Sequence, residues 1–128
     1  MTDEMKIKKR ILIVDDEEDI VMVLRLRIAS WGYEVIPARN GEEAIRLLEE
    51  NPPPDLILMD LKMPLMGGSE TCRRIRADKR FAGIPLVLAT SSVNAGKENY
   101  YLEIGANDYV LKPYNSEELR GKIKKFIG

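Results

Sequence analysis

The sequence contains no histidine and one cysteine, Cys72. Without histidine, a Ser-His-Asp triad, a histidine-based metal site and a histidine phosphate carrier are all excluded. Any phosphohistidine in the chemistry of this chain must therefore belong to another protein. A single cysteine forms no internal disulfide and offers no zinc-binding spacing, so we expect Cys72 to be a plain buried thiol within a helix.

The chain also lacks an excess of charge and a long apolar run. Its 20 basic and 21 acidic residues give a net charge of −1, so no basic field points to nucleic acid or to an acidic membrane surface. No apolar run approaches the roughly 20 residues that a membrane helix needs. The acidic N-terminus is followed by no hydrophobic signal segment, and we therefore expect a cytoplasmic location.

The 128 residues, with 45% hydrophobic and 32% charged, are about one soluble domain, spanning 1–128 with a core at about 8–127. Short runs rich in Ile, Val and Leu predict strands buried on both faces. A fifth, more mixed run contains a proline and predicts an edge strand. The four apolar runs are 11–14, 56–59, 86–89 and 109–111, and the mixed run is 33–38.

Helical patterns lie between these runs. Asn40 with Glu43, and Asn115 with Glu118, look like helix starts in which the first residue caps the helix. Gly105 should end the fourth helix. The expected helices are 18–30, 40–50, about 68–78, about 94–104 and 116–127.

Five strands alternating with five helices imply a parallel sheet with helices on both faces. Right-handed crossovers leave few topologies. The doubly wound, flavodoxin-like order 2-1-3-4-5 places the proline-containing second strand at an edge, as expected.

Polar residues follow the buried runs. Asp15 and Asp16 come after the first, Asp60 after the second, Thr90 after the third and Lys112 after the last. The carboxyl ends of parallel strands meet at one edge, where open α/β sheets bind ligands. Three carboxylates close together favour a bound Mg²⁺, which accepts oxygen ligands and keeps several waters. A carboxylate nucleophile, a metal and a cation are the equipment for phosphoryl transfer to an aspartate.

Each of these residues has a simpler interpretation when it is taken alone. The acidic residues after the first run could be a solvated helix N-terminus. Asp60 could be a turn residue, and Thr90 could start a helix. Lys112 before a proline would mean little. The hypothesis of one site depends on all of them falling at equivalent strand ends of one sheet.

At these positions the chain resembles the receiver domains of response regulators in two-component signalling. The motifs are Ile-Leu-Ile-Val-Asp-Asp-Glu at 11–17, Leu-Met-Asp-Leu-Lys-Met-Pro at 58–64, Ala-Thr-Ser at 89–91 and Gly-Ala-Asn-Asp-Tyr-Val-Leu-Lys-Pro-Tyr at 105–114. The resemblance covers about 11–127. The chain departs from the family pattern at Gly67, where many members carry an acidic residue, and at Ser91, where alanine is common.

The resemblance implies an acceptor and a metal site. Asp60 would accept a phosphoryl group from a histidine kinase or a histidine phosphotransfer protein. Asp16 would ligate Mg²⁺ directly, and Asp15 would help through water. Asp60 itself and the backbone carbonyl of Lys62 would complete the protein ligands. The chain would be a signalling protein that catalyses only its own phosphorylation and dephosphorylation.

The resemblance also implies a switch. Lys112 would pair with one phosphoryl oxygen, Thr90 would hydrogen-bond another, and the Lys112–Pro113 peptide would be cis. Tyr109 would move inward as Thr90 shifts, which would remodel the face of the fourth helix, fifth strand and fifth helix for a downstream effector protein. Candidate positions on this face are Lys97, Tyr100, Tyr101 and Lys122. The chain would be a monomer or weak dimer, without direct nucleic-acid binding.

Three other functions remain open. A haloacid-dehalogenase-like enzyme also uses a strand-end aspartate, but it needs a second aspartate where this chain has Lys62. A flavodoxin-like module needs a phosphate-binding first loop rich in Ser, Thr and Gly, whereas the loop here is acidic at 15–19. A pseudo-receiver that only binds partners would show no Mg²⁺-dependent phosphorylation.

Overall fold

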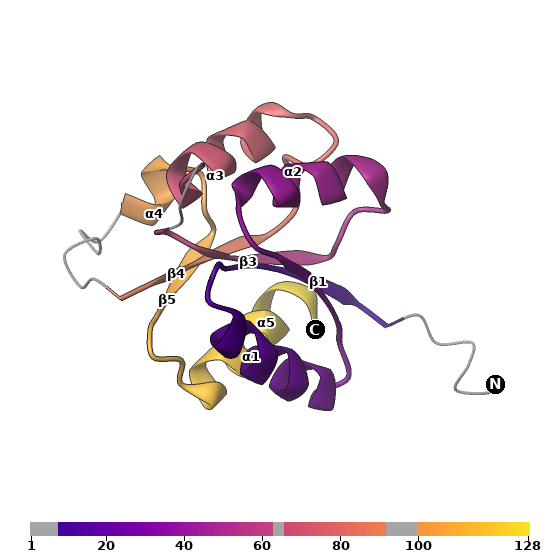
Figure 1. Cartoon of the computed structure of the whole chain (residues 1–128), viewed down its shortest axis with the longest axis vertical. Coiled ribbons are helices and arrows are strands. Elements are labelled where there is room, and N and C mark those ends of the chain that lie inside the picture. The colour runs from indigo at the N-terminus through magenta and orange to yellow at the C-terminus, as the bar shows by residue number, and fades with distance from the viewer. Residues whose placement is uncertain (1–7, 63–65, 92–99) are drawn as a thin grey trace.

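The computed structural model describes residues 8–62, 66–91 and 100–128 (Figure 1). Strands and helices alternate through them as expected. The strands are β1 (Arg10–Val14), β2 (Glu34–Ala38), β3 (Leu56–Asp60), β4 (Leu86–Thr90) and β5 (Asp108–Leu111). The helices are α1 (Glu18–Ser30), α2 (Gly41–Glu50), α3 (Gly68–Ala77), α4 (Tyr100–Glu103) and α5 (Ser116–Ile127). The predicted start of the fourth helix lies outside the described residues.

The structure confirms the predicted capping residues at the starts of α2 and α5. The side chain of Asn40 accepts a hydrogen bond of 2.8 Å from the backbone N–H of Glu43, and Asn115 accepts one of 2.9 Å from Glu118. Each bond satisfies a donor that the first turn of a helix leaves unpaired. After α4, Gly105 has a φ of 97°, the left-handed conformation that glycine adopts without strain.

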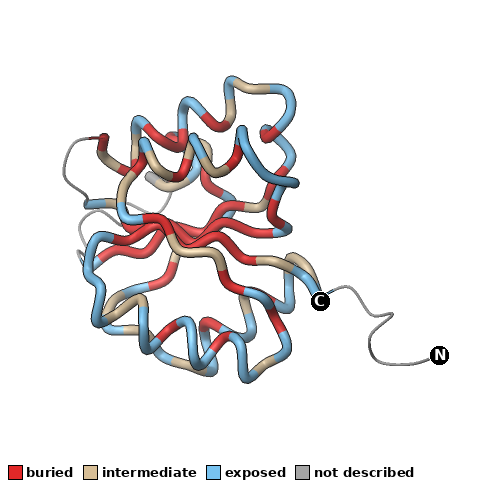
Figure 2. Tube along the Cα trace, turned by 45° about the vertical axis from the view of Figure 1, so that its right-hand side comes forward, coloured by how far each residue is buried: buried red, intermediate tan, exposed pale blue. Residues whose placement is uncertain are grey.

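All five strands are parallel, in the order β2-β1-β3-β4-β5. In Figure 1, α2, α3 and α4 lie on one face of the sheet, and α1 and α5 lie on the other. Successive side chains of a strand point to opposite faces, so each strand contributes to two cores. Leu12 and Ile57 pack under α2 and α3, whereas Ile11 and Leu58 pack against α1 and α5. The buried centre of the sheet is visible in Figure 2.

The fifth strand differs from expectation. We expected 109–111 to be buried on both faces, but only Val110 is buried, and Leu111 is 41% exposed. The reason is its position, because β5 is an edge strand with a single neighbour, β4. Pro37 lies in β2 at the opposite edge, as expected. Cys72 is fully buried in α3, which confirms the prediction for the thiol.

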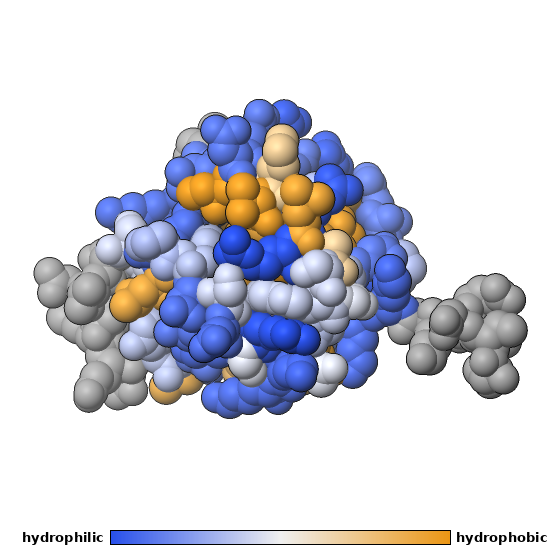
Figure 3. All heavy atoms as spheres, turned by 90° about the horizontal axis from the view of Figure 1, so that it is seen from below, coloured by the Kyte–Doolittle hydropathy of each residue, from blue (hydrophilic) through white to orange (hydrophobic). Residues whose placement is uncertain are grey.

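Helix α1 carries apolar side chains on its solvent side as well as in the core. Met22, Val23 and Leu26 are 62%, 52% and 70% exposed. Figure 3, which views the molecule from the side of α1 and α5, shows a gathering of apolar atoms on this face. Among the helices that the structure describes, none is long and apolar enough to span a membrane.

Candidate functional site

The strand ends bring the predicted site residues together. Asp15 follows β1, Asp60 and Thr90 end β3 and β4, and Lys112 follows β5. Asp15, Asp60 and Thr90 are only 2%, 7% and 6% exposed. Polar side chains are seldom buried this deeply unless they are paired or functional, so this edge of the sheet is the candidate site.

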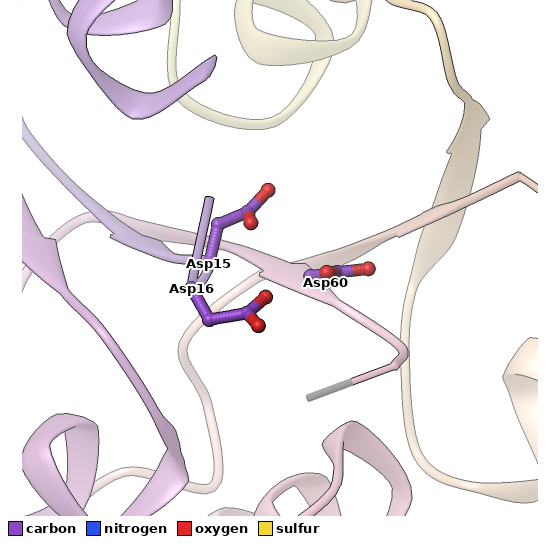
Figure 4. A group of neighbouring side chains, drawn as sticks. All are labelled: Asp15, Asp16 and Asp60. Atoms are coloured by element: carbon purple, nitrogen blue, oxygen red, sulfur yellow. The ribbon is translucent and has the colours of Figure 1, made fainter. Parts of the chain in front are cut away.

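Three carboxylates form its anionic side. Figure 4 shows Asp15 and Asp16 at the end of β1 and Asp60 at the end of β3, with their carboxylates directed to the same side. One oxygen from each lies within 4.8 Å of the others. Asp15 and Asp60 are buried, and Asp16 is exposed. An all-oxygen donor set of high negative charge that is open to water on one side fits Mg²⁺.

Lys112 forms the cationic side. Its Nζ lies 3.1 Å from a carboxylate oxygen of Asp15, 3.1 Å from one of Glu17 and 3.4 Å from one of Asp60, and its side chain is 11% exposed. Burial alone would lower the pKa of Lys112, but hydrogen bonds and attraction from these carboxylates hold the pKa well above its usual value. The ammonium is therefore charged at any physiological pH.

The charge state of Asp60 reflects two opposing effects. Burial raises the pKa of Asp60, and the nearby Asp15 carboxylate adds to the rise. Lys112 and the backbone N–H of Lys62, which donates to Asp60 at 3.3 Å, lower it without cancelling it. The Asp60 carboxylate is thus poorly solvated, and a bound cation would favour its ionised form. The predicted role of the Lys62 carbonyl as a ligand stays a prediction.

The backbone joins Thr90 to Lys112. The N–H of Lys112 donates to the carbonyl of Thr90 at 2.8 Å, and the N–H of Leu61 donates to the carbonyl of Ala89 at 2.9 Å. The first residue after β3 and the first residue after β5 are therefore both hydrogen-bonded to the end of β4, directly beside the acceptor. The Lys112–Pro113 peptide is cis, as predicted.

The start of α3 also touches this loop system. The N–H of Gly68 donates to the carbonyl of Leu61 at 3.1 Å, and a Cβ at Gly68 would lie 2.6 Å from the carbonyl oxygen of Asp60. Only glycine fits this close approach without a shift of the backbone. The neighbouring Gly67 has open space where a Cβ would be, so its departure from the family pattern does not disturb the packing.

Tyr109 lies half-buried on β5, and its predicted inward movement stays a prediction. Its ring centroid lies 5.1 Å from that of Tyr101, and Lys122 Nζ lies 5.0 Å from the Tyr109 ring. Lys122 also donates to the Tyr109 carbonyl and to the Asp108 carboxylate, the latter at 3.1 Å. Lys97 and the side chain of Tyr100 lie outside the described residues.

A hollow of about 480 Å³ opens beside the acceptor. Its lining includes Glu17, Asp60, Lys62, Ser91 and Lys112. The space is large enough for a phosphoryl group with water and a hydrated ion. Sequence reasoning had placed Glu17 only in an acidic run, because the contact between Glu17 and Lys112 joins positions 95 residues apart.

Comparison with known proteins places this geometry in a family. The family model described as "Response regulator receiver domain" matches residues 11–124. The alkaline phosphatase synthesis transcriptional regulatory protein PhoP of Bacillus subtilis is 37% identical over 119 residues, which cover 93% of this chain and 48% of PhoP. The chain therefore spans about half the length of such curated relatives.

Solved structures agree with this assignment. The chemotaxis response regulator CheY4 of Vibrio cholerae superposes with a TM-score of 0.86 at 26% identity, covering 94% of this chain and 100% of CheY4. The response regulator TrrA of Thermotoga maritima, solved in complex with Mg²⁺-BeF, gives a TM-score of 0.83 at 34% identity, covering 93% of this chain and 99% of TrrA. The chain belongs to the response regulator receiver domain family and is a receiver domain of phosphorelay signalling.

Proposed function

We propose that this receiver domain accepts a phosphoryl group on Asp60 from a phosphohistidine of a histidine kinase or histidine phosphotransfer protein, in a Mg²⁺-dependent reaction. One observation carries the proposal. The carboxylates of Asp15, Asp16 and Asp60 meet at one sheet edge, with the Lys112 ammonium 3.4 Å from the acceptor. This arrangement combines a nucleophile with the charges that phosphoryl transfer requires.

The metal would be held by the carboxylates of Asp15, Asp16 and Asp60 together with the backbone carbonyl of Lys62. TrrA, solved with Mg²⁺-BeF, shows that a related receiver binds this pair of groups. When bound, Mg²⁺ would neutralise negative charge on the transferring group. The exposure of Asp16 suits it to direct ligation, and the contact of Asp15 with Lys112 suits Asp15 to a role through water.

Residues of this chain would perform the transfer and bind its product. The ionised carboxylate of Asp60 attacks the phosphorus in line, a P–O bond forms, and the P–N bond to the donor imidazole breaks. Lys112 bonds one oxygen of the resulting acyl phosphate, and the Thr90 hydroxyl bonds another. Water attack on the same phosphorus later returns Asp60 and releases inorganic phosphate. The domain thus catalyses only its own phosphorylation and dephosphorylation.

The phosphoryl group would then act as a switch. It adds about −1.5 to −2 charge near pH 7. That charge attracts the Thr90 hydroxyl and the Lys112 ammonium, and the backbones of these two residues are already hydrogen-bonded to each other. Movement of these loops gives Tyr109 room to turn further inward, which changes the surface of α4, β5 and α5. A downstream effector protein reads that surface.

The surface of α1 supports a proposal about the donor protein. The exposed apolar side chains of α1 lie on the helix that follows Asp15 and Asp16, and they suit contact with a donor protein. PhoP is a transcriptional regulatory protein, but this chain covers only about half of it. From its balanced net charge of −1, we propose that the domain itself contacts a protein effector and not nucleic acid, in the cytoplasm and as a monomer or weak dimer.

Incubation with acetyl phosphate, followed by intact mass measurement, tests the proposal. The wild type should gain the mass of one phosphoryl group only when Mg²⁺ is present, and Asp60→Asn should gain none. Asp19→Asn, which removes an exposed carboxylate from the first turn of α1, is the matched control and should be labelled like the wild type. Wild-type protein that stays unlabelled with Mg²⁺, and binds no beryllofluoride, would support a pseudo-receiver instead.

A further inference from the structure

The Lys112 ammonium lies among three carboxylates. The partners are Asp15 and Glu17 at 3.1 Å and Asp60 at 3.4 Å. A lysine ammonium has three donors and no more. Phosphorylation turns the Asp60 carboxylate into an acyl phosphate, so an oxygen of the phosphoryl group then competes with Asp15 and Glu17 for the donors of Lys112.

The three partners differ in how easily they can leave. The side chain of Asp15 is 1% exposed and also accepts the N–H of Glu17 at 2.9 Å, so it is held in place. The side chain of Asp60, which is 8% exposed, carries the phosphoryl group and no longer competes as a free carboxylate. The side chain of Glu17 is 55% exposed, and its carboxylate can turn into water at little desolvation cost. Glu17 is the partner that yields.

The local structure leaves the Glu17 side chain available for this role. Glu17 is the N-cap residue of α1, but its side chain makes no capping hydrogen bond. Its backbone N–H, which donates to Asp15, is independent of the side chain. A substitution at position 17 therefore removes the contact with Lys112 without removing a helix cap.

We propose that Glu17 is a positioning residue whose carboxylate competes with the phosphoryl group on Asp60 for Lys112. Before phosphorylation Glu17 occupies one donor of Lys112, and on phosphorylation an oxygen of the phosphoryl group replaces it. The acidic side chain at position 17 thereby lowers the affinity of the site for the phosphoryl group. This inference rests on the proposed function of Asp60.

Beryllofluoride, a phosphoryl mimic, tests the competition by titration at saturating Mg²⁺. Glu17→Gln keeps the size of the side chain and removes its charge, and its Kd should fall about three- to fivefold, the effect of one partly exposed ion pair. Glu18→Gln is the matched control, because Glu18 is an exposed neighbour in the first turn of α1 that does not line the hollow beside Asp60. Its Kd should stay within twofold of the wild type.

A second measurement follows Lys112 in the metal-free protein. Labelling by an amine-reactive ester, located by peptide mass, should be faster at Lys112 in Glu17→Gln than in the wild type and unchanged in Glu18→Gln. Equal Kd values in all three proteins would overturn the inference, as would an equal gain in both variants, which would mark a general charge effect. A wild type that binds no beryllofluoride would overturn the proposed function, and the inference with it.

Discussion

Replacement of Lys112 by methionine should destabilise the metal-free protein strongly. Methionine keeps a long apolar side chain and removes the ammonium that lies between Asp15, Glu17 and Asp60. Two of these carboxylates are buried and would face each other without a counter-ion. The charge would then be the main change, because the methylene groups of lysine and methionine pack alike.

The magnitude follows from the contacts. At an effective dielectric constant of about 20, one contact at 3.1 Å corresponds to roughly 5 kcal/mol of Coulomb attraction before desolvation is subtracted. Desolvation of the ammonium offsets much of the total, and the exposed Glu17 adds little. Loss of one partner from a buried ion pair costs about 3–5 kcal/mol. Because the hollow beside Lys112 lets water reach the unpaired carboxylates, we expect a cost of about 3 kcal/mol here. For a domain of this size, that loss lowers Tm by roughly 10 °C.

Urea unfolding in chelator at pH 7 would measure the loss. Saturating Mg²⁺ should raise the free energy of unfolding of Lys112→Met more than that of the wild type, because the ion neutralises the same carboxylates as Lys112 does. The raised pKa of Lys112 means that its stabilisation is complete at pH 7 and is lost only as the pH rises through that raised value. Toward pH 4 the gap between the two proteins should narrow as the carboxylates take up protons.

A surface lysine provides the control. Lys125 is 64% exposed and pairs with Asp108 at 3.5 Å, so Lys125→Met should change the free energy of unfolding by less than about 0.5 kcal/mol. The reasoning that Lys112 is the counter-ion of a buried carboxylate pair would be refuted if Lys112→Met, at pH 7 without metal, had a free energy of unfolding within about 1 kcal/mol of the wild-type value.

Two further predictions concern Asp60 and Arg76. The pKa of Asp60 in the folded protein is raised above its unfolded value of 3.8. The protonated carboxyl therefore contributes stability that is fully present below pH 3.8 and is lost as the pH rises through the folded pKa. Asp60→Asn should therefore resist urea better than the wild type at pH 7 without metal and lose the advantage at acid pH; equal midpoints at pH 7 would contradict this. The guanidinium of Arg76 donates to the carbonyls of Gly105, Ala82 and Ile84 and to the Asn107 side chain. Arg76→Met should lower the free energy of unfolding by about 2 kcal/mol, since these acceptors lose charged donors; thermal unfolding checks this, with the exposed Arg74→Met as control.

Much of the fold could be predicted because local chemistry specifies it. Apolar runs of three or four residues marked four of the strands, and Asn40 and Asn115 marked helix starts that the structure confirms. Alternation of strands and helices implies a parallel sheet, whose carboxyl ends meet at one edge. The positions of Asp15, Asp60, Thr90 and Lys112 at one site therefore followed from their order along the chain.

Other features depended on contacts between distant positions. The exposure of Leu111 reflects the edge position of β5, which the apolar run at 109–111 does not reveal. The bonds of Arg76 to Gly105 and Asn107 join residues 29 and 31 positions apart, and Lys112 meets Glu17 across 95. A long side chain has many rotamers, and the neighbours that the fold places around it select one. The sequence by itself determined which charged groups reach this edge of the sheet, and only the tertiary structure decided which of them pair.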